Sequence, residues 1–525
     1  MALLPKLSFK APRRTNRNLS HIVRFTASPG VLDPILTEDI LPGDTVKLDI
    51  IEDVLTYPTL APILGSFTVE TTVFFTPWRN WYRMLHEDAI LSSFDKLTYG
   101  TLALMPFHKY NFKQPSTKPL PESSLLAFLG FRPLARFGSS TPDSYTEMFN
   151  AHGLISYLDI FRTYFMDPQV NFCFQFFAAG LSRVNCSDIQ AIYDEIVNNK
   201  GPVELSSIHS GSYYYLGPEL MGAHIGKFVR SYAPDVVNVW LDSSSVSQIN
   251  SGTSVEVVDG KFSIDSLNLA SKLKMYFDRI MVSGNRYSGF VGSLFGQKIR
   301  RDLNIPQLLG RFSQELSFKN VVQQSASTEG SPLGTLAGFG HSTKRSNRTI
   351  KFTAPEFGTL QVIHCIIPHP DYYQRFDPQL KRLSFADCYN PMFDKIGFEP
   401  QYSAFRGYTD GTSTSGGDWS TVAGNPFKWV YGYLPAWSSY TSRVNRLLGD
   451  FVSTLRYWTL AQPMGVTNAG TSDPNLQTPH SYIMPYLFNY AFADTSKTAQ
   501  NFLCQVAFGL RMKRPISKSQ LPNIR

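Results

Sequence analysis

The residues best suited to chemistry are the cations at the two ends of the chain. Residues 1–32 and 511–525 contain no acidic residue, and Lys and Arg side chains there can neutralise the phosphates of a nucleic acid. We take ten of these cations as candidate DNA-binding residues: Lys6, Lys10, Arg13, Arg14, Arg17, Arg24, Arg511, Lys513, Arg514 and Lys518.

The charge of the remaining chain makes the two ends stand out. The 525 residues carry a formal net charge of +8, yet the part between the ends holds 38 of the 49 basic residues against all 41 acidic ones. A near-neutral body with basic arms favours a polyanionic partner, and nucleic acid first. A pair of solvated tails without a ligand is the alternative.

A second basic cluster lies in mid-chain. Lys344, Arg345, Arg348 and Lys351 precede Phe352, whose ring could stack on a base. A solvated loop before a strand explains the same residues equally well.

Motifs for catalysis and for metal binding are missing from the sequence. The tract with Gly338 and Gly340 lacks the Gly-Lys-Ser/Thr of a phosphate-binding loop, and His364 and His369 have no second pair of ligands near them in sequence. The five cysteines are scattered without CxxC spacing. The sequence therefore predicts no enzyme, no cofactor and no metal, although carboxylate pairs that meet only in the fold stay open.

The composition points to contact with other proteins. Charged residues make up 17% and aromatic residues 14%, and the cores of protein interfaces lose charge while they gain Tyr, Trp, Phe and Arg. Trp78, Arg79 and Trp81 are candidate residues of a subunit interface. A large aromatic core, with the two tryptophans inside it, is the alternative.

The element that positions these three residues is a long strand over 66–76. Its alternate positions from Phe67 to Phe75 are suited to a core, and only Phe74 breaks the alternation. Pro77 is suited to the first position of a helix that has Thr76 as its N-cap.

Further strands are spread along the chain with long, uneven gaps, which favours a two-sheet sandwich with insertions over a repeat protein. We expect them at 45–51, 170–177, 236–241, 316–322, 348–354, 359–367 and 501–510. Helices are expected near 154–165, 187–200 and 265–282, and loops rich in Gly, Ser, Thr, Asn and Pro at 323–348, 406–426 and 464–480.

Signals for membrane insertion and export are missing as well. The sequence has no run of 18 apolar residues, and the apolar run before Pro5 is too short for a signal peptide. These features predict a product without a membrane span that is made and used in a cytosol.

Several blocks of sequence, taken in order, resemble the major capsid protein of the Microviridae, in particular the gokushovirus-type branch of small single-stranded DNA phages. They are "LPGDT" with "FTVETTVFFTPWRNWY", then "SGNRYSGFVGSLFG", "DLNIPQLLG" and "SPLGTLAGFG", then "YGYLPAWSSYTSRVNRLLGDF", "YWTLAQP" and "RPISKSQLP".

The resemblance implies a mainly β fold, an eight-stranded antiparallel jelly-roll sandwich with long insertions that contain a few helices. The capsid domain would span 33–510, between a basic arm (1–32) and a basic tail (511–525). It would assemble with itself into a T=1 icosahedral shell around circular single-stranded DNA, in the cytoplasm of a bacterial host. Other virion proteins and a host receptor would be further partners, and insertion 199–262 is our candidate for the outward protrusion.

Two other functions are compatible with the residues alone. A β-sandwich enzyme or lectin that acts on carbohydrate would also be rich in aromatic residues. A monomeric nucleic-acid-binding protein would share the basic ends but would form no shell.

Overall fold

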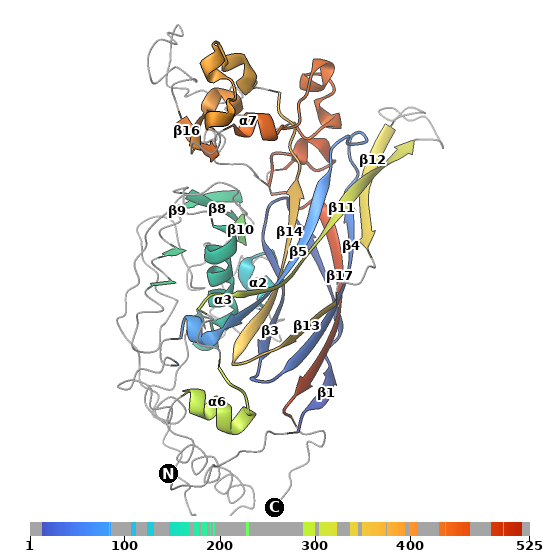
Figure 1. Ribbon diagram of the computed structural model, residues 1–525. Coiled ribbons are helices and arrows are strands. Elements are labelled where there is room, and N and C mark those ends of the chain that lie inside the picture. The colour runs from blue at the N-terminus through green and yellow to red at the C-terminus, as the bar shows by residue number, and fades with distance from the viewer. Residues whose placement is uncertain are drawn as a thin grey trace, which may run out of the picture.

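The computed structural model describes a central antiparallel sheet with helices and turns at its side and ends (Figure 1). The described residues are 13–82, 85, 107–111, 123–130, 146–166, 172–177, 180–185, 189–190, 193–194, 227–229, 287–299, 304–322, 336–344, 349–373, 375–393, 398–406, 430–435, 437–461, 485–496 and 498–516.

Ten strands form the main sheet, in the order β1-β17-β4-β12-β11-β5-β14-β3, with β2 also on β17 and β13 also on β4. Their bounds are β1 Thr15–Asn18, β2 His21–Ala27, β3 Asp33–Ile40, β4 Thr45–Thr56, β5 Phe67–Pro77, β11 Gln307–Val322, β12 Leu336–Lys344, β13 Thr349–Thr353, β14 Gly358–Pro368 and β17 Phe502–Arg514.

The sheet curls into two layers that β11 joins. The first part of this 16-residue strand pairs with β5, from Gln307 to Leu316, and the last part pairs with β12, from Ser317 to Val322. One layer therefore contains β3, β14 and β5, and the other contains β4, β17, β12 and β13. This arrangement confirms the predicted antiparallel β-sandwich.

The core between the layers follows from the alternation of side chains along each strand. On β17, Val506, Phe508, Leu510 and Met512 are buried, and the residues between them face outward. Aliphatic residues of β3, β4, β5 and β14 complete the same cluster.

The outer face of the β5 and β14 layer is covered as well. Helix α3 (His152–Ile160) continues as the π-helix η3 (Phe161–Phe165), and both pack on this face. Phe74, which breaks the alternation of β5, belongs to this second cluster and meets the ring of Phe165 at 6.0 Å between centroids. A strand covered on both faces is buried on both faces, which explains why almost all of β5 is enclosed.

Shorter elements surround the sandwich. The small sheets pair β6 (Phe107–Asn111) with β7 (Thr146–Asn150), β8 (Phe172–Phe177) with β9 (Gly180–Asn185) and β10 (Lys227–Val229), and β15 (Phe398–Tyr402) with β16 (Val430–Pro435). The short helices include α2 (Leu125–Phe128), α6 (Tyr287–Phe295) and α7 (Ser438–Thr441).

The two basic ends belong to the sheet over part of their length. Strands β1 and β2, from the predicted arm, pair with β17, and β17 itself continues to Arg514 inside the predicted tail. Without β1 and β2, eight of the ten strands of the main sheet remain, from β3 to β17.

Two sequence predictions differ from the structure in detail. Residues 336–344, within the predicted loop 323–348, form strand β12. The glycines suggested a loop, but Gly340 is needed for close packing, since a Cβ atom there would lie 2.8 Å from Thr56 Cγ2 and 2.9 Å from Leu316 Cδ2. The N-cap of the turn after β5 is Pro77, one residue later than predicted.

Other predictions lie outside the described residues. These are the strand at 236–241, the helix at 265–282, the loop at 464–480, nearly all of the loop at 406–426, and insertion 199–262 except for β10.

Candidate nucleic-acid interface

The aromatic residues that follow β5 lie inside the chain. Trp78 is 8% exposed and Trp81 is 1% exposed, and Trp78 Nε1 donates a hydrogen bond to Thr359 Oγ1 at 2.9 Å. Both indoles lie against His152, with centroid distances of 4.2 and 5.4 Å. This burial supports the intramolecular interpretation of the two tryptophans, because enclosed side chains offer no surface to a second copy.

Arg79 has a structural partner of its own. Its Nε and Nη2 atoms donate to the two carboxylate oxygens of Glu356 at 3.1 and 3.2 Å. Burial raises the pKa of Glu356 and the guanidinium opposes that rise. A two-pronged pair between a buried carboxylate and a largely buried guanidinium fixes the turn after β5 against the segment just before β14.

The uncovered face of the β17 and β4 layer gathers cations that are far apart in sequence. Arg511 on β17 is directly opposite Lys47 on β4, and Lys47 is directly opposite Lys351 on β13. Arg511 and Lys351 are exposed, and the side chain of Lys47 is 42% exposed. We call these three residues the cation row.

Polar residues on β1, the strand at the edge of the sheet beside β17, extend the cation row. Asn18 on β1 is opposite Arg511, and the next exposed row contains Lys513 with Asn16 as its neighbour on β1. One carboxylate stands close, since Asp49 Oδ2 lies 3.5 Å from Lys47 Nζ. Like charges directly opposite each other on neighbouring strands destabilise a sheet, so an anionic ligand would relieve the repulsion within this row.

Other predicted DNA-binding residues pair within the chain. Arg514 Nε lies 3.1 Å from Asp44 Oδ2, and its Nη2 donates to Glu38 Oε1 at 3.3 Å. Arg14 also lies near the Asp44 carboxylate, whose pKa burial raises while both arginines oppose the rise. Arg24 Nε donates to Gln505 Oε1 at 2.7 Å and is exposed on β2.

The remaining predicted cations fall into two groups. Arg13 is exposed just before β1, and Arg17 is half-buried on β1. Lys6, Lys10 and Lys518 lie outside the described residues.

The sequence analysis does not identify Lys47 as a site residue, and it names Lys351 only as a member of the mid-chain basic cluster. Both occupy outward positions of predicted strands, in "TVKLDII" and "RTIKFTA". The signal that could have found them is the pairing of β4 with β13 and β17, which brings three separate segments into one row.

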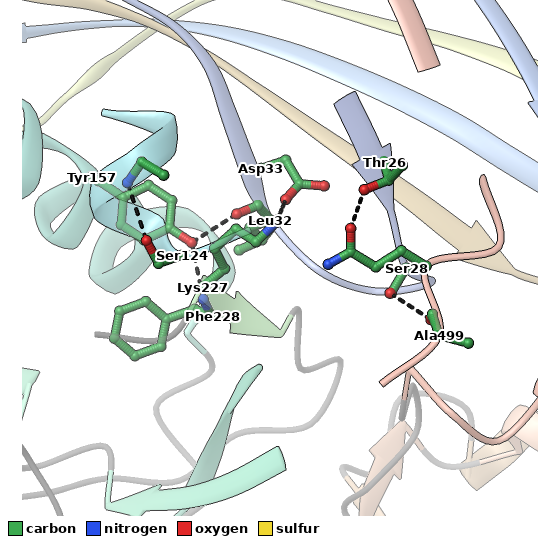
Figure 2. A network of polar contacts seen from close by, with 11 residues as sticks. Thr26, Ser28, Leu32, Asp33, Ser124, Tyr157, Lys227, Phe228 and Ala499 are labelled. Atoms are coloured by element: carbon green, nitrogen blue, oxygen red, sulfur yellow. Dashed lines mark hydrogen bonds and ion pairs between the residues drawn. The ribbon is translucent and has the colours of Figure 1, made fainter. Parts of the chain in front are cut away.

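A buried polar network fastens the insertion that contains β10 to the start of β3 (Figure 2). Lys227 Nζ lies 2.5 Å from Asp33 Oδ1, and both side chains are buried. The Tyr157 hydroxyl donates to the Leu32 carbonyl at 2.9 Å and accepts from the Phe228 N–H at 3.0 Å. Burial raises the pKa of Asp33, whereas Lys227 opposes the rise.

A second buried cluster ties the two layers together. His364 Nε2 on β14 lies 3.1 Å from Glu52 Oε1 on β4, and Thr71 Oγ1 on β5 donates to the same oxygen at 3.0 Å. Burial alone would lower the pKa of His364, but Cys504 and Glu52 raise it to about 10. Because the His364 and Glu52 side chains have no exposed surface, the cluster serves packing and offers no access to a substrate.

Two searches of the described residues gave negative results. No group of three or more His, Cys, Asp or Glu side chains there is arranged to hold a metal ion. None of the helices described is long and apolar enough to cross a membrane.

Comparison with known proteins gives a consistent family. The family model described as Capsid protein (F protein) matches residues 8–89 and 224–524. Capsid protein VP1 of Chlamydia phage 1 is 26% identical over 267 residues, which cover 50% of this chain and 42% of that protein. The match thus spans about two fifths of the length of this relative.

The family match and the sandwich agree with the resemblance to Microviridae major capsid proteins that the sequence blocks indicate. The cation row lies within the matched residues. The chain belongs to the Capsid protein (F protein) family.

Proposed function

We propose that this capsid protein assembles with itself into a small icosahedral shell, and that the uncovered face of its β17 and β4 layer contacts the phosphates of an enclosed single-stranded DNA. The cation row is the observation that carries the DNA contact. Family membership supports the structural role and placement in a virion.

The chemistry of the row suits a backbone contact without sequence readout. Ammonium and guanidinium groups bind phosphates as charges, and the amides of Asn16 and Asn18 can donate to phosphate oxygens beside them. Exposed Ile22 and Ile51 lie further along the same face and could contact bases. Exposed aromatic side chains for stacking are not found among the described residues of β1, β4, β13 and β17.

The proposal leaves no role for catalysis. The alternative of a carbohydrate-active enzyme or lectin has no support from the family match, and the buried His364 and Glu52 pair has no access to a ligand. Assembly in the host cytoplasm, other virion proteins and a host receptor belong to the proposal as well. Exchange of the parts of insertion 199–262 on either side of β10, with Lys227 and Phe228 kept, should alter host attachment and leave particle yield unchanged.

Salt dependence of DNA binding tests the face directly. In a Lys47→Gln/Lys351→Gln variant, the plot of log affinity for single-stranded DNA against log salt should become shallower by roughly 1.4, at about 0.7 for each phosphate that is no longer neutralised. Fluorescence anisotropy with a labelled oligonucleotide at several salt concentrations measures this slope.

A matched variant separates a local effect from a change in net charge. Lys298→Gln/Lys381→Gln removes two exposed lysines, one just after α6 and one at the end of the turn Pro378–Lys381, neither of them on a strand of the main sheet. Its slope should equal that of the unaltered chain. Equal slopes for both double variants would remove the cation row from DNA binding, and an unaltered chain that stays monomeric under all assembly conditions would refute the shell.

A further inference from the structure

Many large apolar side chains are exposed in one lobe beyond the end of the sandwich. We call residues 375–393 and 437–461 the apical lobe, which lies at the top of Figure 1. Its exposed apolar residues are Phe376, Leu380, Leu383, Phe385, Tyr389, Met392, Tyr440, Leu448 and Tyr457. Phe385 is 98% exposed and Leu383 is 85% exposed.

The turn that presents Phe385 is held in one conformation. The Asp387 carboxylate accepts hydrogen bonds from Leu383 N at 3.0 Å, from Ser384 N at 2.9 Å and from Ser384 Oγ at 3.0 Å. The bond from Ser384 N is one arm of a capping box on the turn Phe385–Asp387, and in the other arm the Ser384 side chain accepts from the Asp387 N–H. An exposed phenylalanine on a fixed turn is prepared for a partner, because little conformational entropy remains to be lost when it binds.

Contacts with α7 fix the same segment from its other side. The Arg382 guanidinium lies 3.8 Å above the Tyr440 ring and donates to Ser439 Oγ at 2.6 Å. The Tyr389 N–H donates to the Tyr440 hydroxyl at 3.2 Å. The segment 382–389 is therefore clamped onto α7 while its apolar tips point away from the chain.

Backbone hydrogen bonds join the apical lobe to the segment that follows β14, so a force applied to the lobe is transmitted to the main sheet. Asp371 N donates to the Leu460 carbonyl at 2.9 Å and Tyr372 N to the Asn445 carbonyl at 3.2 Å, directly after β14. Arg446 and Arg375 form ion pairs with Asp377 at the base of the lobe.

The exposed area matches what an interface between two copies needs. At on the order of 200 Å² for each large apolar side chain, the nine residues expose on the order of 1,000 Å² together, against about 800 Å² for each partner in a standard interface. A lone soluble chain seldom exposes an apolar patch above about 600 Å². We propose that the apical lobe is a contact between copies of this chain, with Phe385 and Leu383 inserted into a neighbouring copy.

This inference rests on the proposed self-assembly and adds the place of the contact. A second copy is the favoured occupant because every copy in a closed shell presents the same lobe. One contact made by this rigid apolar lobe is therefore repeated throughout the shell. A different virion protein or a host receptor as occupant would leave the lobe open in particles made from this chain alone.

Particle formation by a charged variant tests the inference. In Phe385→Asp, the fraction of protein that sediments as particles should fall at least tenfold, while the thermal unfolding temperature of the unassembled chain stays unchanged because Phe385 is fully exposed. Phe385→Trp should assemble normally. Ile305→Asp makes the same kind of change at a half-exposed apolar residue before β11 and should assemble like the unaltered chain.

Oxidative footprinting of Met392 identifies the occupant. Met392 is 86% exposed in the single chain, so its conversion to the sulfoxide should be rapid in the unassembled protein and slow in particles. Normal assembly of Phe385→Asp, or equal oxidation of Met392 in both forms, would overturn the inference while the unaltered chain still forms particles. If the unaltered chain forms none, the proposed shell fails first.

Discussion

His152 is a single residue whose protonation should be visible in the stability of the whole chain. It begins α3, lies enclosed between Trp78 and Trp81, and burial lowers its pKa to about 4. In the unfolded chain this histidine has an ordinary pKa near 6.5, so between about pH 4 and pH 6.5 it is protonated in the unfolded state and neutral in the folded state. The contribution of His152 to the free energy of unfolding is therefore complete above about pH 6.5. It is lost as the pH falls toward 4, and the loss amounts to about 3 kcal/mol.

Urea unfolding at pH 7 and at pH 4 measures this effect. The carboxylates titrate in the same range, so the comparison is with His152→Phe, which keeps a ring against the two indoles. The free energy of unfolding should drop by about 3 kcal/mol more in the unaltered chain than in the variant. An equal drop in both proteins would show that His152 is protonated in the folded state.

Individual residues also show where sequence reasoning reaches its limit. The lysines and arginines of the two ends are visible in the sequence, but their surroundings are not. Arg514 meets the buried Asp44 carboxylate, whereas Lys513, its neighbour, is exposed on the opposite side of β17. Which of two adjacent cations can meet a phosphate depends on the face of the strand, and that face is set by pairing across the sheet.

At the scale of elements, the start of β14 depends on a glycine. A Cβ atom on Gly358 would lie 2.5 Å from Phe75 Cε2 and 2.7 Å from the Thr76 carbonyl oxygen, and backbone cannot move aside cheaply. Gly358→Ala should therefore lower the free energy of unfolding by about 1–3 kcal/mol, as overpacking does elsewhere. Gly292→Ala on α6 is the control, because its nearest contact would be 3.8 Å away and alanine favours a helix. Denaturant unfolding should show no loss for Gly292→Ala, and equal losses in both would contradict the packing argument.

Some strands could be predicted from the sequence and others could not. The alternating apolar residues of β5, β14 and β17 are strong signals, and these strands lie where the sequence places them, within a few residues at each end. The sequence predicts a loop where β12 lies, because Gly338 and Gly340 are typical of turns. Their role appears only when Thr59, Thr56 and Leu316 are brought next to them by strand pairing.

At the scale of the whole molecule, the short amino-terminal strands form one edge of the sheet and keep the 13-residue β17 from being an edge strand. Strands β1 and β2 cover β17 along nearly its full length. Deletion of residues 1–27 should leave β17 with a bare edge and cause aggregation, since unpaired strand edges template pairing with other chains. Static light scattering should rise for this truncation and stay at the level of the full chain for deletion of residues 1–12, which spares both strands. A soluble, monomeric 28–525 chain would contradict this role for β1 and β2.

The continuity of β11 has a mechanical consequence. The first part of β11 is hydrogen-bonded to β5 in one layer and its last part to β12 in the other. One layer could therefore slide over the other only if backbone hydrogen bonds of β11 broke with one of these two strands. Pressure from inside a closed particle would therefore load both layers at once, and each wall unit should yield by a single cooperative rupture.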